Sequence, residues 1–141
     1  MILALSLRLW NIHFGIPNYY HIDERIKINV IKSIISGDLN PDYFRHPGFM
    51  LYSISILYIP FKLFGIPPTS TNLLLIGRTF IALLGTATVF LTYLIAKQTY
   101  NNKIALLSAS FLAIVPLHVI CSHYIKEDIP LGFWVTLSFL F

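Results

Sequence analysis

The sequence predicts an all-α membrane protein, in which multi-pass membrane helices carry an extracytoplasmic loop with amphipathic interfacial helices. The composition indicates this first, because 56% of the 141 residues are hydrophobic and the mean hydropathy is +0.72. Only 11% of the residues are charged, whereas soluble domains carry about a quarter. These values argue against a soluble enzyme and exclude a disordered chain. Uncharged apolar runs of membrane-spanning length are the third indication.

Four apolar segments are expected to be embedded in the membrane. They lie near residues 1–17, 79–97, 104–125 and 129–141, and a loop over 18–78 separates the first two. The segment 49–64 is shorter and contains Pro60 and Lys62, so we expect a re-entrant or interfacial helix that does not cross. Because both ends of the chain are apolar, we expect it to be the N-terminal part of a longer multi-pass protein.

The orientation of these helices follows from two lysines. Lys97 and Lys103 flank a short link with the turn signal Asn101-Asn102. The positive-inside rule places that link in the cytoplasm and the loop 18–78 outside. Small residues on the flanking helices favour close packing as a hairpin. They are Ala82, Gly85 and Thr86 on one helix, and Ala105, Ala109 and Ala113 on the other.

Within the long loop, residues 24–36 are expected to form an amphipathic helix at the membrane interface. Its apolar stripe is predicted to contain Ile22, Ile26, Val30, Ile31, Ile34 and Ile35. Asp23 is expected to cap its N-terminus, and Gly37 occupies the place of a C-terminal glycine. The aromatic residues Tyr19 and Tyr20 precede this helix, as aromatics do at headgroup depth.

Two acidic pairs, Asp23-Glu24 and Glu127-Asp128, stand at predicted membrane boundaries, each before a helix. Carboxylates at such positions can act only as helix caps and dipole partners. If the segment 49–64 does not cross, however, two crossings separate the pairs, and both pairs face outside. The cations expected on the same side are Arg78, Lys126 and His46. Such a surface suits an anionic lipid headgroup, with a carboxylate as general base and cations on a phosphate.

Several short motifs resemble one known family when they are taken in order. They are Leu7-Arg8-Leu9-Trp10-Asn11, the run from Gly15 to Glu24, Gly37-Asp38-Leu39-Asn40-Pro41, His46-Pro47-Gly48-Phe49, Arg78 with Ala82 and Gly85, and Pro116-Leu117-His118 followed by Glu127 and Asp128. The pattern is similar to that of GT-C type glycosyltransferases that use polyprenol-phosphate sugars. Protein O-mannosyltransferases and aminoarabinose transferases belong to that group. Gly48 departs from the double proline that is more common there.

The resemblance implies a sugar transfer from a lipid-linked phosphate donor to an acceptor hydroxyl. Asp23 resembles the catalytic base, and Glu24 resembles the neighbour that helps to place a substrate. Glu127 and Asp128 match a second acidic motif. Arg78 resembles a donor-phosphate ligand, and Lys126 and His46 are expected to assist it. The resemblance leaves open a divalent metal, the sugar and the acceptor, which could be a protein, lipid or glycan.

The resemblance further implies an enzyme of a prokaryotic plasma (inner) membrane with its active site facing outside, and a piece of it is expected to be inactive alone. The lipid bilayer and the lipid-linked donor are the expected partners, and nucleic acid is not. One alternative is a transporter or ion-pathway subunit, although the charged residues gather at helix ends. Another is a non-catalytic membrane protein fragment.

Overall fold

The computed structural model describes residues 1–19 and 21–141, and these residues form helices and connecting loops without a strand. Tyr20, which was expected at headgroup depth, lies outside the described residues. The helices are α1 (Ile2–Leu9), α2 (Ile22–Ser36), α3 (Phe49–Leu63), α4 (Ser70–Thr99), α5 (Asn102–Ile114), α6 (Pro116–Cys121) and α7 (Asp128–Ser138). The all-α class predicted from the sequence is confirmed.

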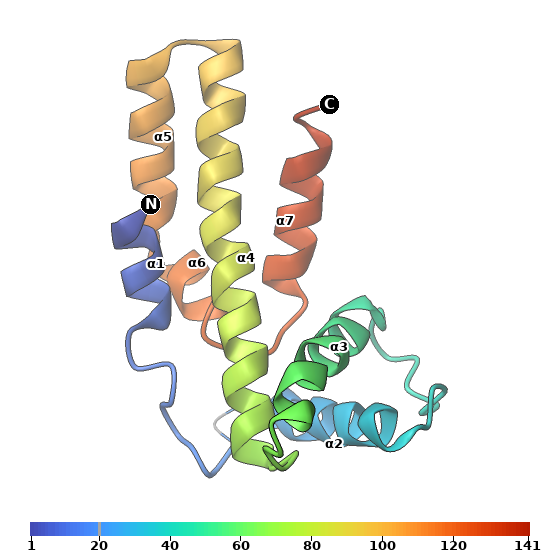
Figure 1. Cartoon of the computed structure of the whole chain (residues 1–141). Helices are drawn as coiled ribbons and strands as arrows, with labels where there is room; N and C mark the ends of the chain where they lie inside the picture. Colours follow the sequence, from blue (N-terminus) through green and yellow to red (C-terminus); the bar gives the residue numbers. More distant parts are fainter. Residues whose placement is uncertain (20) are drawn as a thin grey trace.

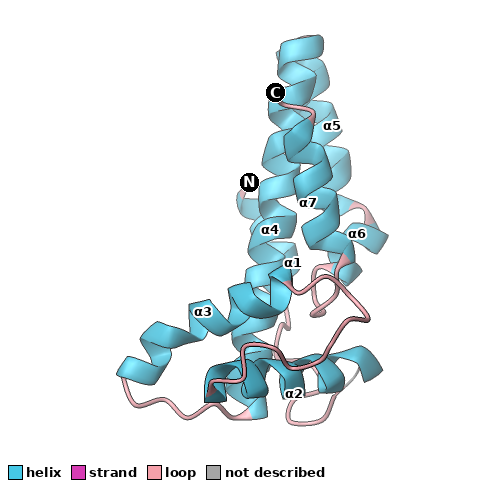
Figure 2. Ribbon diagram, turned by 90° about the vertical axis from the view of Figure 1, so that its right-hand side faces the viewer, coloured by secondary structure: helices cyan, strands magenta, loops and turns pink. Residues whose placement is uncertain are grey.

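The helices form an upright bundle with two further helices at its base (Figure 1). The long helix α4 packs against α5 on one side and α7 on the other, and α1 lies against α4 and α5. Figure 2 shows that α2 and α3 project from the base of α4, away from the bundle axis. The link between α4 and α5 is at the opposite end, so α4 and α5 form the antiparallel hairpin that the sequence predicts.

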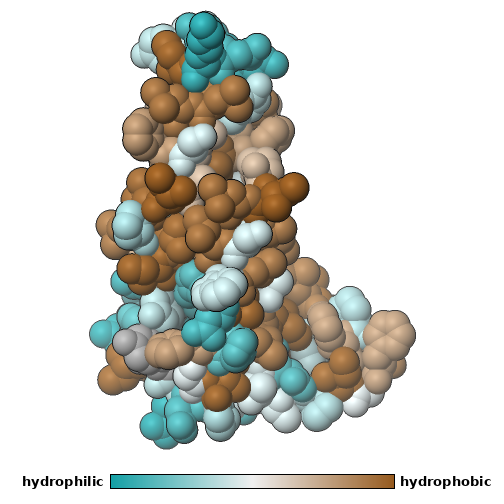
Figure 3. Space-filling view, turned by 90° about the vertical axis from the view of Figure 1, so that its left-hand side faces the viewer, coloured by the Kyte–Doolittle hydropathy of each residue, from teal (hydrophilic) through white to brown (hydrophobic). Residues whose placement is uncertain are grey.

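Helix α4 is 30 residues long, and a rise of about 1.5 Å per residue gives it a length of about 45 Å. Among the described helices, it is the one that is long and apolar enough to cross a membrane, and α3 and α5 are shorter apolar helices. On the face that Figure 3 shows, hydrophobic surface covers the middle of the bundle, and hydrophilic residues gather toward both ends. This distribution fits a bilayer around the bundle.

Helix α4 begins earlier than the sequence pattern indicates, because residues 70–78 were expected to belong to the loop. The Thr69 side chain accepts a hydrogen bond from the Asn72 amide and caps the helix at this earlier position. Leu73 and Leu74 are fully buried in the first turns. Arg78 is therefore the ninth residue of a long helix and does not stand at a helix start.

Two other predicted helices are shorter than expected. Helix α1 ends at Leu9, well before residue 17, because the chain turns through Asn11 and Gly15, which both have positive φ. The predicted helix 104–125 is interrupted between α5 and α6. Val115 adopts an extended conformation there, as the residue before a proline tends to do, and Pro116 starts the new helix.

Helix α2 occupies the predicted position, but its buried face differs from the predicted stripe. The buried side chains are Glu24, Lys27, Ile28, Ile31 and Ile34. Ile22 and Ile26, which were expected in the apolar stripe, are 79% and 39% exposed. The N-terminal cap is His21, whose ring accepts from the Asp23 amide, so Asp23 is the second helical residue and not the cap. Gly37 ends the helix with φ 109°, as predicted.

The main hydrophobic core lies where the base of α4 meets α2, α3 and the segment before α7. It contains Ile28, Ile31, Ile34, Met50, Leu51, Ile54, Tyr58, Leu73, Leu74, Ile81, Ile125 and Ile129. The residues come from α2, α3, α4, α7 and the α6–α7 loop. This core therefore fixes the first acidic pair, on α2, relative to the second, before α7.

Two glycines in α4 and α7 should respond oppositely to alanine. A Cβ on Gly77 is 2.5 Å from Cδ1 of Ile125 and 3.3 Å from Cδ1 of Ile54, whereas one on Gly132 meets nothing within 4 Å. We expect Gly77→Ala to destabilise by about 1–3 kcal/mol through overpacking. Gly132→Ala should stabilise by up to about 1 kcal/mol through helix propensity. Thermal unfolding in detergent measures both, and equal shifts contradict this packing.

Candidate active site

A buried ion pair joins the first acidic pair to α4. Arg78 Nη2 donates to Glu24 Oε2 over 2.7 Å, and Arg78 Nε donates to Glu24 Oε1 over 2.9 Å. The side chains are 2% and 0% exposed, respectively. The planar guanidinium thus binds the carboxylate through two parallel hydrogen bonds, which is the strongest geometry for such a pair.

The same ion pair holds two loops against the helices. Arg78 Nη1 donates to the carbonyl oxygens of Ile12, over 2.9 Å, and Phe14, over 2.7 Å. Glu24 Oε1 also accepts from the Ile125 amide over 3.2 Å. The pair therefore connects α2 and α4 with the turn after α1 and with the segment that leads to α7. The four Arg78 bonds occupy four of the five N–H groups of a guanidinium.

A second buried cation, Lys27, joins α2 to the second acidic pair. Its Nζ lies 2.7 Å from Glu127 Oε1 and 2.9 Å from Glu127 Oε2, and it donates to the Ile125 carbonyl oxygen over 2.9 Å. Lys27 is fully buried, and Glu127 is 21% exposed. His46 Nδ1 lies 3.9 Å from Glu127 Oε1. The structure therefore brings the two acidic pairs together at one end of the bundle.

The other member of each acidic pair faces outward. The Asp23 side chain is 29% exposed, and its Oδ2 lies 3.6 Å from His21 Nδ1. The Asp128 side chain is 53% exposed and lies 3.2 Å from the ammonium of Lys126, which is 39% exposed. The hydrogen bond to Asp128 raises the pKa of Lys126. Asp23 and Asp128 are therefore the more exposed carboxylates of the two pairs.

Tyr43, in the loop between α2 and α3, lies within the electrostatic range of both acidic pairs. Its pKa is raised first by burial and then by the negative charge of Glu127; the positive charge of Arg45 opposes this, and Asp23 adds the smallest upward effect. Because a raised pKa keeps the phenol protonated, Tyr43 adds no negative charge near these acidic residues.

Two of the cavities next to these residues are lined by Arg78 and by Glu127, respectively. One, of about 300 Å³, is lined by Trp10, Asn11, Ile12, Phe14, Arg78, Ile120, His123 and Tyr124. The other, of about 150 Å³ between α3 and α7, is lined by Pro47, Phe49, Met50, Glu127, Pro130, Leu131 and Trp134. The His21 and Tyr124 rings lie 5.6 Å apart, centroid to centroid. This contact places the N-terminus of α2, with Asp23, next to a residue that lines the larger cavity.

The predicted phosphate ligands fall into two groups. Lys126 and His46 are partly exposed, whereas Arg78 is 1% exposed and engaged by Glu24. Its contact with a donor phosphate stays a prediction. Sequence reasoning missed Lys27, although its spacing from Glu24, Ile28 and Ile31 places it on the buried face of α2. In the described part of the chain, no cluster of three His, Cys, Asp or Glu side chains is placed to hold a metal ion.

The family model described as dolichyl-phosphate-mannose-protein mannosyltransferase matches residues 68–141, more than half of the chain. The chain belongs to this family. No curated protein and no solved structure matches it. Membership in this mannosyltransferase family confirms the predicted relationship and identifies the chain as part of a membrane glycosyltransferase family.

The family match covers α4 to α7 and includes Arg78, Lys126, Glu127 and Asp128. Asp23 and Glu24 lie outside the matched residues. The case for these two acids therefore rests on their own geometry, above all on the ion pair between Glu24 and a residue inside the match, Arg78.

Breaking the buried ion pair should unfold the base of the bundle. Glu24→Gln leaves Arg78 without its counter-charge, and such a loss typically costs about 3–5 kcal/mol. Arg78→Lys should also destabilise, because an ammonium cannot reproduce the two parallel bonds or reach both loop carbonyls. Asp42→Asn, at an exposed position, is the control. Denaturation in detergent measures these changes, and a Glu24→Gln protein as stable as Asp42→Asn contradicts the role of the pair.

Proposed function

We propose that this protein transfers a sugar from a lipid-linked phosphate donor to an acceptor hydroxyl, with Asp23 as the general base. Family membership supports the reaction class. The choice of Asp23 as the base rests on the different partners and exposure of the two residues in each acidic pair. Glu24 is buried against Arg78 and Glu127 is bound by the buried Lys27, whereas Asp23 is 29% exposed and, among the described residues, has no lysine or arginine within ion-pair distance.

The chemistry follows from the acceptor. An alcohol has a pKa far above neutrality, so its oxygen needs a base during attack. In the proposed step, the acceptor oxygen forms a bond to the anomeric carbon of the sugar, and the bond from that carbon to the phosphate oxygen breaks. The hydroxyl proton passes to the Asp23 carboxylate, and the lipid phosphate leaves with the bonding electrons.

The leaving phosphate accumulates negative charge, which nearby cations stabilise. Lys126 and His46 are exposed at the same end of the bundle as Asp23 and are proposed to contact the phosphate. Arg78 lines the larger cavity while it is bound to Glu24, and its positive charge is proposed to attract the phosphate from there. Asp128 is proposed to line the acceptor side, because it is the exposed acid of the second pair.

The name of the family indicates the substrates to test first, a polyprenyl-phosphate mannose as donor and a protein hydroxyl as acceptor. We also propose a multi-pass topology with this end of the bundle outside the cell, since Lys97 and Lys103 lie at the opposite end. A requirement for a divalent metal is tested by adding a chelator to the transfer assay.

Asp23→Asn should abolish transfer without unfolding the protein. Asparagine keeps the size and hydrogen bonding of the side chain but cannot take a proton, and loss of a general base typically costs about 10²–10⁴ in rate. The assay follows labelled mannose from polyprenyl-phosphate mannose into a Ser/Thr peptide, with Asp42→Asn as a matched control. An Asp23→Asn variant that keeps the transfer rate of the Asp42→Asn control contradicts the proposal.

The proposed topology predicts that both exposed acids can be reached from outside. In a Cys121→Ser background, Asp23→Cys and Asp128→Cys should each react with a membrane-impermeant maleimide added to intact cells. Tyr100→Cys, near the opposite end of α4, should react only after the membrane is permeabilised. If Asp23→Cys and Asp128→Cys react from opposite faces, the two acids cannot share one site.

A further inference from the structure

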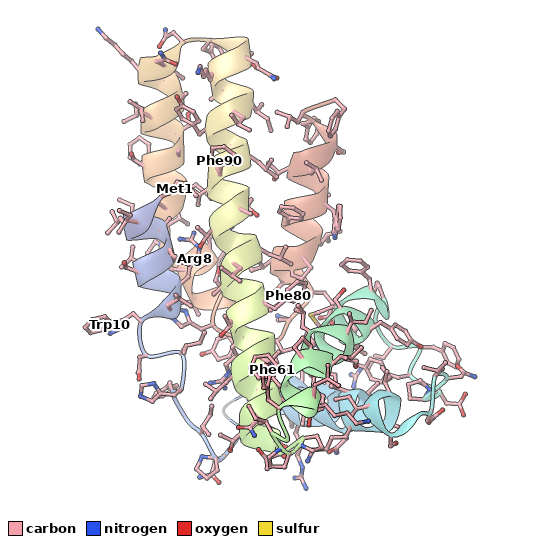
Figure 4. All side chains as sticks on the ribbon, in the orientation of Figure 1. Met1, Arg8, Trp10, Phe61, Phe80 and Phe90 are labelled. Carbon is pink, nitrogen blue, oxygen red and sulfur yellow. The ribbon has the colours of Figure 1, made fainter. Side chains whose placement is uncertain are left out.

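Arg8, near the end of α1, is fully buried inside the bundle, although the sequence pattern predicts no partner for it. Figure 4 shows its side chain reaching from α1 toward the interior of the bundle. Among the described residues, no carboxylate lies within ion-pair distance of its guanidinium. A buried cation without a carboxylate partner is costly, so its surroundings must supply other acceptors.

Three of the four acceptors are groups at the break between α5 and α6. Arg8 Nη1 donates to the carbonyl oxygen of Ala113 over 3.2 Å and to that of Ala4, in its own helix, over 2.8 Å. Nη2 donates to the carbonyl oxygen of Leu112 over 3.3 Å and lies 2.9 Å from His118 Nδ1. A guanidinium has no acceptor, so the His118 nitrogen accepts this bond.

Pro116 explains why these carbonyls need a donor from elsewhere. In a continuous helix, residue 116 would donate its amide to Leu112, but proline has no N–H. The extended conformation of Val115 also turns the chain away, and the Leu117 amide gives no hydrogen bond to Ala113. Within a membrane no water replaces these donors, and each unsatisfied carbonyl costs several kcal/mol.

Helix α4 makes room for the guanidinium at Gly85. A Cβ at this position would lie 3.1 Å from Arg8 Nε and 2.5 Å from Ser122 Oγ. The junction therefore combines Arg8 from α1, Gly85 from α4 and the interrupted helix α5–α6. The negative end of the α5 dipole also faces the cation, which favours a positive charge there.

We propose that Arg8 is a positioning residue, which caps the interrupted α5–α6 helix inside the membrane and thereby places the segment 122–127 against the acidic site. That segment supplies the Ile125 amide to Glu24 and the Ile125 carbonyl to Lys27. It also supplies the Glu127 carboxylate to Lys27. The consequence for catalysis rests on the proposed function, whereas the consequence for the position of the segment does not.

The position of α7 relative to α2 tests the proposal directly. Spin labels at Asn29→Cys and Val135→Cys, both exposed, report this distance in the full chain with Cys121→Ser. Arg8→Gln should shift or broaden the distance distribution. Arg8→Lys should restore part of it, because an ammonium can still donate to the two carbonyls. An unchanged distribution in Arg8→Gln overturns the proposal.

A second substitution separates positioning from stability. In Arg8→Gln/Pro116→Ala, residue 116 regains an amide that donates to Leu112, so the thermal stability lost in Arg8→Gln should return. The helix then continues through residue 115, so the label distance should stay displaced. Transfer should remain reduced by about 10²-fold, the typical cost of a misplaced catalytic group. Transfer that returns together with stability overturns the positioning role.

The Pro116→Ala variant and a comparison with Asp23→Asn keep these outcomes distinct. Pro116→Ala alone, with Arg8 intact, should also displace α7, and this variant provides the test if Arg8→Gln does not fold. An unchanged label distance in Pro116→Ala then overturns the proposal. If Asp23→Asn retains transfer while Arg8→Gln displaces α7, the proposed function fails and the structural inference stands. If Asp23→Asn loses transfer while the label distance in Arg8→Gln is unchanged, the proposed function stands and the structural inference fails.

Discussion

The buried ion pair between Glu24 and Arg78 is the constraint on which the base of the structure depends. It is a fork of two hydrogen bonds between α2 and α4, and the remaining bonds of both side chains hold the turn after α1 and the Ile125 amide. Burying two charges is unfavourable unless every polar atom is paired. The pair therefore stabilises only one arrangement of these segments, in which the interfacial helices lie against the start of the long membrane helix.

Two more buried cations, Lys27 and Arg8, also connect segments of the chain through polar contacts. Lys27 neutralises Glu127 and binds a loop carbonyl, so it adds a second connection between α2 and the segment before α7. Arg8 binds carbonyls that a proline leaves without donors. In each case the positive charge lies on one segment and most of its acceptors lie on another that is distant in sequence. Polar contacts of this kind define the relative positions of helices whose apolar surfaces could pack in several ways.

The sequence pattern predicts the helices better than the partners of their side chains. Apolar runs and glycine signals located α2, α3, α4 and α7, because hydropathy and backbone preference act locally. The buried face of α2 was predicted only in its second half: Ile31 and Ile34 are buried as expected, but near the start of the helix Glu24 and Lys27 are buried and Ile22 and Ile26 are exposed. Charged side chains usually face water. Glu24 and Lys27 are exceptions, and their burial is explained by their ion-pair partners elsewhere in the chain. Those long-range partners are not visible in periodicity.

In each acidic pair one carboxylate is bound by a buried cation and the other is more exposed. Neighbouring residues at a helix start point about 100° apart, so they cannot face the same environment. In the first pair the second acid turns inward to Arg78, and in the second pair the first acid turns inward to Lys27. The inward acids tie both helix starts to the same core, and the outward acids, Asp23 and Asp128, are left on one surface. An exposed carboxylate next to a rigid anchor has a fixed position at low conformational cost, which is the requirement for a base that must meet an acceptor hydroxyl.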